Sequence, residues 1–152
     1  MPSVTLAVDH AGRPVIDLYV GLSAATRETL YPSGSFPPPR RVRALVDTGA
    51  SHTVVSGHRL NALGLDPVGQ IKVHSATTEG ELVEVPVYSV CLSLAGDKTG
   101  VLADPLEVVA AGDLSGLGVQ ALLGRDVLSR CLLFYHGPGR TITLTFPPFE
   151  EP

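Results

Sequence analysis

Glycine and proline divide this chain into short pieces, and that spacing constrains the fold more than any other feature. The 152 residues include 16 glycines and 13 prolines. Both are disfavoured inside central strands and frequent in turns, whereas the segments between them are rich in Val, Ile, Leu and Thr. Many short strands separated by turns predict an all-β architecture. The expected strands are VTLAV (4–8), VIDLYVGL (15–22), VRALV (42–46), HTVV (52–55), PLEVVAA (105–111) and the two arms of LLFYHGPGRTITLTF (132–146).

Four segments depart from this simple pattern. GHRLNALGL (57–65) has helix-spaced leucines and ends at a glycine, and GRDVLSRC (124–131) can form a second short helix. Residues 23–41 contain Ser, Gly and the triple proline 37–39, so we expect a long surface loop there. The segment from about 71 to 90 predicts a long hairpin with residues 77–80 at its tip.

Composition places the chain among ordinary globular proteins and argues against several functions. A length of 152 residues predicts one domain over residues 1–152, and 44% hydrophobic with 17% charged residues is typical of a folded chain. A formal charge of −4 argues against nucleic acid or an anionic membrane surface as partner, and no apolar run is long enough to span a bilayer. Cys91 and Cys131, without a signal-peptide pattern, predict free thiols in a cytoplasmic protein. The histidines lack metal-ligand spacing, so we expect no metal and no other cofactor.

An acidic residue directly after an apolar run is the most informative local feature. Asp47 follows Ala44-Leu45-Val46, although an unpaired buried charge costs several kcal/mol. Asp47-Thr48-Gly49-Ala50 could be an ordinary turn, because Asp, Thr and Gly all favour turns. A second segment, ALLGRDVL (121–128), places a glycine between apolar residues and a short helix, and that glycine could pack against the carboxylate loop.

On these two segments the chain resembles the retroviral-type aspartic proteases, the retropepsins. VTLAV is similar to the amino-terminal strand of that family, and VIDLYVGL with VRALVDTGA is similar to the hairpin that leads to the catalytic loop. HSATTEGELVEV (74–85) occupies the place of the flap, and ALLGRDVLSRC is similar to the Gly-Arg-[Asp/Asn]-hydrophobic-Leu motif. The resemblance implies a closed retropepsin-like β-barrel with one or two short helices, active as a two-fold dimer.

The resemblance also implies a role for each matching residue. Asp47 would be the catalytic carboxylate, supported by Thr48, Gly49 and Ala50. Thr48 would hydrogen-bond across the dimer axis, and Gly49 would let the substrate backbone approach. The other implied residues are Ser51, Thr78, Glu79 and Gly80 for substrate binding, the last three at the flap tip, and Gly124, Arg125 and Asp126 as the structural motif.

The chemistry of peptide hydrolysis by carboxylates explains why a dimer is expected. Two carboxylates share one proton, so that one activates water while the other polarises the carbonyl. This chain has a single Asp-Thr-Gly, because DKTG (97–100) carries an inserted lysine. The predicted function is therefore a homodimeric aspartic endopeptidase that uses Asp47 from each copy and binds extended polypeptide.

Departures from the family pattern keep other interpretations open. Several viral members have an acidic residue where this chain has Ser51, paired with the arginine that corresponds to Arg125, and the expected flap has only one glycine. These differences leave a catalytically weak or inactive dimerisation or peptide-binding module as the alternative. Two further interpretations are weaker. Ser51 with His52 or His58 could form a nucleophilic pair, but Thr53 replaces the final glycine of the serine-hydrolase elbow. GLGVQA (116–121) mimics a dinucleotide fingerprint, but Gly124 would interrupt the long helix that such a site needs.

Overall fold

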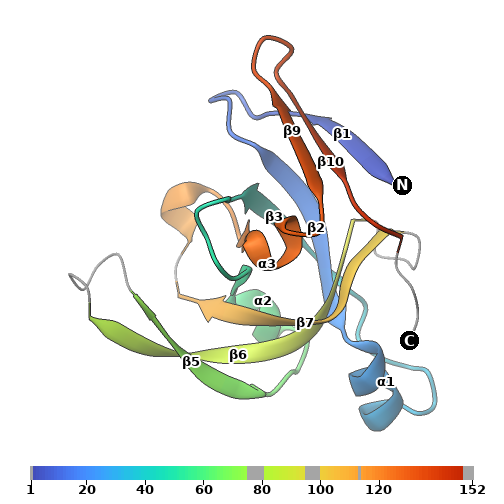
Figure 1. The fold of residues 1–152 in the computed structure, drawn as a ribbon. Helices are drawn as coiled ribbons and strands as arrows, with labels where there is room; N and C mark the ends of the chain where they lie inside the picture. The colour runs from blue at the N-terminus through green and yellow to red at the C-terminus, as the bar shows by residue number, and fades with distance from the viewer. Residues whose placement is uncertain (1, 75–80, 95–99, 113, 149–152) are drawn as a thin grey trace.

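The chain folds into two β-sheets with a few short helices (Figure 1). The computed structural model describes residues 2–74, 81–94, 100–112 and 114–148. The strands are β1 (Ser3–Ala7), β2 (Val15–Leu22), β3 (Arg40–Val46), β4 (Val54–Ser56), β5 (Gly69–His74), β6 (Leu82–Ser93), β7 (Val101–Ala111), β8 (Ala121–Leu123), β9 (Leu132–His136) and β10 (Thr141–Thr145). The helices are α1 (Ala24–Leu30), α2 (Gly57–Asn61), α3 (Arg125–Leu128) and the 3-10 turn η2 (Ser115–Leu117).

The larger sheet closes into a barrel. Its strand order is β2-β3-β8-β4-β7-β6-β5, and β2 also pairs with β6, which joins the two sides. Strand β5 continues the sheet beyond β6 as one arm of a hairpin. Two pairs inside the barrel are parallel, β3 with β8 and β4 with β7. The predicted all-β, retropepsin-like closed barrel is therefore confirmed, and the parallel β3–β8 pair brings its two sequence motifs together.

The alternation of side chains along the strands explains where the core lies. Along β3, Val42, Ala44 and Val46 are buried, whereas the three arginines of the strand are exposed. Leu18 and Val20 of β2 are also fully buried in the same cluster. Full burial of an aliphatic side chain of this size contributes about 1.5–3 kcal/mol. This apolar packing makes β3 a rigid support for the residue that follows it.

A smaller antiparallel sheet of order β1-β10-β9 lies beside the barrel (Figure 1). Its inner face contributes Ile142 and Leu144 of β10 to the core, and both are almost fully buried. Alternate residues face outward, as in the Thr5–Thr143 pair, whose hydroxyl groups are hydrogen-bonded at 2.8 Å. One face of this sheet is thus part of the core and the other is exposed.

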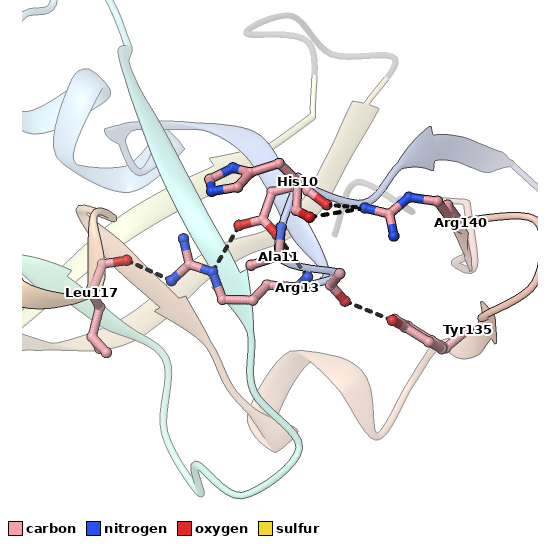
Figure 2. A network of polar contacts seen from close by, with 8 residues as sticks. His10, Ala11, Arg13, Leu117, Tyr135 and Arg140 are labelled. Carbon is pink, nitrogen blue, oxygen red and sulfur yellow. Dashed lines mark hydrogen bonds and ion pairs between the residues drawn. The ribbon is translucent and has the colours of Figure 1, made fainter.

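Polar contacts around the β1–β2 turn join this small sheet to its surroundings (Figure 2). The Asp9 carboxylate accepts hydrogen bonds from the backbone and side chain of Arg13, both at 2.7 Å. These contacts, led by the backbone hydrogen bond, lower the pKa of Asp9. Arg13 also donates to the Leu117 carbonyl at 2.6 Å, and Arg140 donates to the carbonyls of Asp9 and His10. The turn is therefore held in one conformation from several sides.

Two predictions about irregular segments need correction. Residues 23–41 are not a continuous loop, because α1 forms within them and β3 already begins at Arg40. Ser23 caps α1 by accepting a hydrogen bond from the Thr26 N–H, and Asp104 of β7 accepts from the N–H of Ala24. Helix α1 ends at Leu30, before the triple proline at 37–39 begins, so those prolines do not interrupt it. The described residues also contain three α-helices, whereas one or two were expected.

The predicted hairpin from about 71 to 90 corresponds to β5 and β6, which pair antiparallel from Gly69–Val87 to His74–Leu82. Its expected tip, including Thr78, Glu79 and Gly80, lies outside the described residues. The predicted strand 15–22 is present with the same ends as β2, and the other predicted strands and the helices at 57–65 and 124–131 are present with shifted ends.

Candidate active site

Strand β3 places Asp47 at the end of a buried parallel pair. Val46 lies opposite Leu123 of β8, and the Asp47 N–H donates to the Leu123 carbonyl at 2.9 Å. Sheet pairing thus continues up to the backbone of Asp47, and the chain then turns away. Val46 is buried, whereas Asp47 is half-buried and the next two residues are exposed. The apolar strand lies in the core and its carboxylate emerges at the surface, which avoids the cost of burying an unpaired charge.

The turn after Asp47 is organised by the carboxylate itself. Its Oδ1 accepts a hydrogen bond from the Gly49 N–H at 2.9 Å, and its carbonyl accepts from the Ala50 N–H at 3.2 Å. A Cβ atom at Gly49 would lie only 3.2 Å from the same Oδ1, so a side chain there would crowd the turn. Within the described part of the chain no cation is paired with Asp47. One carboxylate oxygen is therefore oriented by a backbone amide, and no charged partner holds the group.

The second motif lies directly against this turn, as the sequence predicted for its glycine. A Cβ atom at Gly124 would lie 2.6 Å from the backbone C and O of His52, so only glycine fits without displacing backbone. The Arg125 N–H donates to the Ala50 carbonyl at 2.8 Å. Its guanidinium Nη1 donates to the Thr48 carbonyl at 2.9 Å. The Arg125 guanidinium therefore binds a backbone carbonyl of the turn. In several viral members the corresponding arginine pairs with an acidic residue, in whose place this chain has Ser51.

Asp126 completes the connection between the motifs through Thr53, a residue to which the sequence assigned no role in this site. The Asp126 carboxylate accepts from the Thr53 N–H at 2.8 Å and from its hydroxyl at 2.7 Å. The same hydroxyl accepts from the Gly124 N–H at 3.1 Å. Thr53 is fully buried, and a buried hydroxyl needs such partners. Its position in a predicted strand gave no sign of this contact, because both partners lie more than 70 residues away in the chain.

The weaker interpretations of this region find little support in the described residues. The Ser51 hydroxyl and His52 Nδ1 lie 3.0 Å apart, but both side chains are exposed. The strand β4 follows Thr53, where the serine-hydrolase elbow requires a helix. The GLGVQA segment forms the short turn η2 and leads into β8, so the long helix of a dinucleotide site is absent at this described position.

Two features are absent from the residues that the structure describes, a cluster of metal ligands and a membrane-spanning helix. Within them, no group of three or more His, Cys, Asp or Glu residues is arranged to hold a metal ion. In the same residues, no helix has both the length and the apolar character needed to cross a bilayer.

Comparison with protein families identifies the chain. A family model described as aspartyl protease matches residues 38–127, which include β3, the turn after it and the start of α3. The chain belongs to the aspartyl protease family. The match covers both motifs, Asp47-Thr48-Gly49 and Gly124-Arg125-Asp126.

Solved structures of other aspartic proteases share the fold of this family member. It is similar to a retropepsin-like aspartic protease from Rickettsia conorii, with a TM-score of 0.61, 16% sequence identity, and coverage of 95% of this chain and 91% of that one. It is also similar to an aspartic proteinase from Irpex lacteus, with a TM-score of 0.54 and 15% identity. That match covers 98% of this chain but 48% of the other, so this aspartyl protease chain spans about half of the Irpex enzyme. No curated protein sequence matches the chain significantly.

Proposed function

We propose that this aspartyl protease family member is a homodimeric aspartic endopeptidase, in which Asp47 of each copy contributes to one catalytic dyad. The observation that carries the proposal is a single surface carboxylate, positioned by its own turn and without a charged partner in the described residues. Peptide hydrolysis of this type needs two carboxylates that share one proton. A two-fold axis between two copies of Asp47 supplies the second one.

The proposed mechanism assigns a separate task to each part of the turn. The ionised Asp47 accepts a proton from the attacking water, while the protonated Asp47 of the partner copy donates to the carbonyl oxygen of the scissile bond. The hydrogen bond from the Gly49 N–H keeps one Asp47 oxygen oriented. The contacts of Arg125 with the Thr48 and Ala50 carbonyls keep the turn rigid, so that the carboxylates meet in a reproducible geometry.

The proposed substrate is an extended polypeptide held between the turn and the β5–β6 hairpin. The hairpin arms project from the barrel, and Leu82 at the start of β6 is 55% exposed. In this proposal Gly49 and Ser51 contact the substrate on the side of the Asp47 turn. Thr78, Glu79 and Gly80 close over its other side and exclude water. All of residues 1–152 then serve as a single catalytic domain.

A substitution at Asp47 tests the mechanism directly. Asp47→Asn should remove cleavage of a peptide library while leaving the circular dichroism spectrum and melting temperature close to those of the wild type. Asp66→Asn is the matched control, because it makes the same charge change at an exposed residue outside the site. Wild-type cleavage rates in Asp47→Asn would refute the proposed mechanism. Absence of cleavage in the wild-type dimer would favour the alternative of an inactive peptide-binding module.

Mixing the two forms tests whether the copies share one site. In an equal, fully exchanged mixture of wild-type and Asp47→Asn chains, about one quarter of the dimers contain two intact copies. Activity per wild-type chain should therefore fall to about one half if each dimer has one shared site. Activity that stays proportional to the wild-type chain alone would contradict a shared dyad.

A further inference from the structure

We infer that Arg13, oriented by Asp9, positions the η2 turn, and that Leu117 of this turn contacts a large apolar side chain of the substrate beside Asp47. This inference rests on the proposed function and adds to it two positioning residues and a preference among polypeptide substrates. Three observations support it: the register of β2 against β3, the hydrogen bonds of the Arg13 guanidinium, and the exposure of the Leu117 side chain.

The pairing of β2 with β3 places Arg13 beside Asp47. The Val46 N–H donates to the Pro14 carbonyl at 2.8 Å, in the antiparallel register of the two strands. One further step of this register brings Arg13 opposite Asp47, and opposite residues of an antiparallel pair project to the same face. The backbone N–H and carbonyl of Arg13 bond to Asp9 and not to β3, as expected at a non-hydrogen-bonded position of such a pair.

The Arg13 guanidinium connects the β1–β2 turn with η2 (Figure 2). Its Nε donates to the Asp9 carboxylate at 2.7 Å, and its Nη1 donates to the Leu117 carbonyl at 2.6 Å. Asp9 is itself held, because its other carboxylate oxygen accepts from the backbone N–H groups of Ala11 and Arg13. A planar guanidinium that is fixed through one N–H group presents the others in fixed directions. Arg13 therefore transmits the fixed position of the β1–β2 turn to η2.

The segment that follows Leu117 is attached to the barrel. The Gln120 N–H donates to the Arg43 carbonyl at 2.8 Å, and the Gln120 side-chain oxygen accepts from the Arg43 N–H at 2.8 Å. Val119 is almost fully buried. The segment is therefore held at both ends, by Arg13 at one end and by β3 at the other.

The Leu117 side chain contributes little to the core. It is 45% exposed, and η2 contains no buried residue. A single exposed leucine is common on protein surfaces, but this one is fixed within the length of one arginine side chain of the residue opposite Asp47. An apolar side chain that is fixed beside a site in this way provides a contact for an apolar group of the ligand.

The chemistry of this contact predicts which substrate side chain it binds. An extended polypeptide that passes Asp47 presents alternate side chains to the same side. The side chain that covers Leu117 leaves water on binding, and a large apolar one gains the most from this change. The charge of Arg13 is paired with Asp9, so it does not offer a separate site for an acidic side chain. We therefore expect Leu, Met or Phe at one position close to the cleaved bond.

Cleavage kinetics of the full-length protein test the role of Leu117. The probes are the best-cleaved peptide of a library and derivatives in which each large apolar residue in turn is replaced by alanine. For the wild type, one derivative should have a kcat/KM at least about tenfold lower than the parent peptide. Leu117→Ala should reduce this ratio to less than about threefold. Leu30→Ala is the matched control and should leave the ratio unchanged, since Leu30 is 60% exposed on α1.

Arg13→Gln tests the positioning role, because it removes the guanidinium. The KM for the parent peptide should rise at least about threefold with kcat close to that of the wild type, since the contact is made in the bound substrate as well as in the transition state. Adding Leu117→Ala should reduce the preference little further, because one residue acts through the other. Arg13→Lys should restore only part of the preference, since an ammonium group lacks the planar fork. Arg41→Gln is the matched control, because Arg41 is paired with Asp17.

Peptide binding separates this inference from the proposed function. In Asp47→Asn, fluorescence anisotropy measures the Kd of the same peptides, labelled, without cleavage. A preference in binding that depends on Leu117, with no cleavage by the wild type, would support the inference and refute the endopeptidase proposal. If the protein neither cleaves nor binds any peptide, both proposals are refuted.

The variants also separate the two parts of the inference. Cleavage with the same preference in the wild type, Leu117→Ala and Arg13→Gln would overturn the inference while the endopeptidase proposal stands. A preference that changes in Leu117→Ala but not in Arg13→Gln would overturn the positioning role. Circular dichroism checks the fold of each variant, and if Arg13→Gln does not fold, Arg13→Lys decides the positioning role.

Discussion

Asp126 accepts three hydrogen bonds, and replacing its carboxylate tests how α3 holds the loop after Asp47. Oδ1 accepts from the Thr53 hydroxyl at 2.7 Å and the Val127 N–H at 2.9 Å, and Oδ2 accepts from the Thr53 N–H at 2.8 Å. In Asp126→Asn one oxygen becomes an NH₂ group. Only the Thr53 hydroxyl can rotate to accept from it. Either orientation of the amide therefore sets the NH₂ group against a backbone N–H.

The geometry gives the size of the expected effect. A buried donor left without a partner costs about 1–3 kcal/mol, and a hydrogen bond to a neutral acceptor contributes about 1 kcal/mol less than one to a charged acceptor. We expect the free energy of unfolding to fall by about 2–4 kcal/mol, which for a chain of this size lowers the melting temperature by about 4–16 °C. The loss should be accompanied by slower peptide cleavage, because Thr53 and Gly124 position the loop.

Thermal unfolding followed by circular dichroism measures this effect. Asp66→Asn is the control for the change in net charge, since its side chain is exposed, and its melting temperature should stay within about 1 °C of the wild type. A melting temperature of Asp126→Asn equally close to the wild type would refute the reasoning. The three contacts would then contribute nothing net to the stability of the fold.

Two further substitutions test the packing of the motif and the environment of a cysteine. Gly124→Ala places a Cβ atom 2.6 Å from the His52 backbone and should cost about 1–3 kcal/mol of stability. Gly116→Ala, with open space around its Cβ position, is the control, and equal melting temperatures for the two variants would contradict the packing argument. Burial raises the pKa of the Cys91 thiol from 9.0 to about 11, so the unfolded chain loses this proton first and stability should fall as pH rises through that interval. Urea denaturation gives the free energy of unfolding at about pH 8 and about pH 10, and its decrease between them should be smaller in Cys91→Ala than in the wild type. An identical decrease in both proteins would contradict the role given to Cys91.

Local features of the sequence were enough to predict most of the strands and the position of Asp47. Glycine and proline mark turns through their backbone preferences, and β2 begins and ends where the apolar segment does. Helix α1 was missed because its residues, AATRETL, have no buried face, so the apolar periodicity used to predict helices was absent. The ends of β4 and β7 also shifted, since strand ends depend on the neighbouring strand.

The sequence alone therefore determined which residues are candidates for the site: the single acidic triplet at Asp47 and the Gly124-Arg125-Asp126 motif. Only the tertiary structure showed that Arg125 binds a backbone carbonyl and that Asp126 binds Thr53. The physical reason is the range of the interactions. Turn and strand preferences act between neighbours in the chain, whereas hydrogen bonds between residues more than 70 positions apart exist only after the barrel has closed.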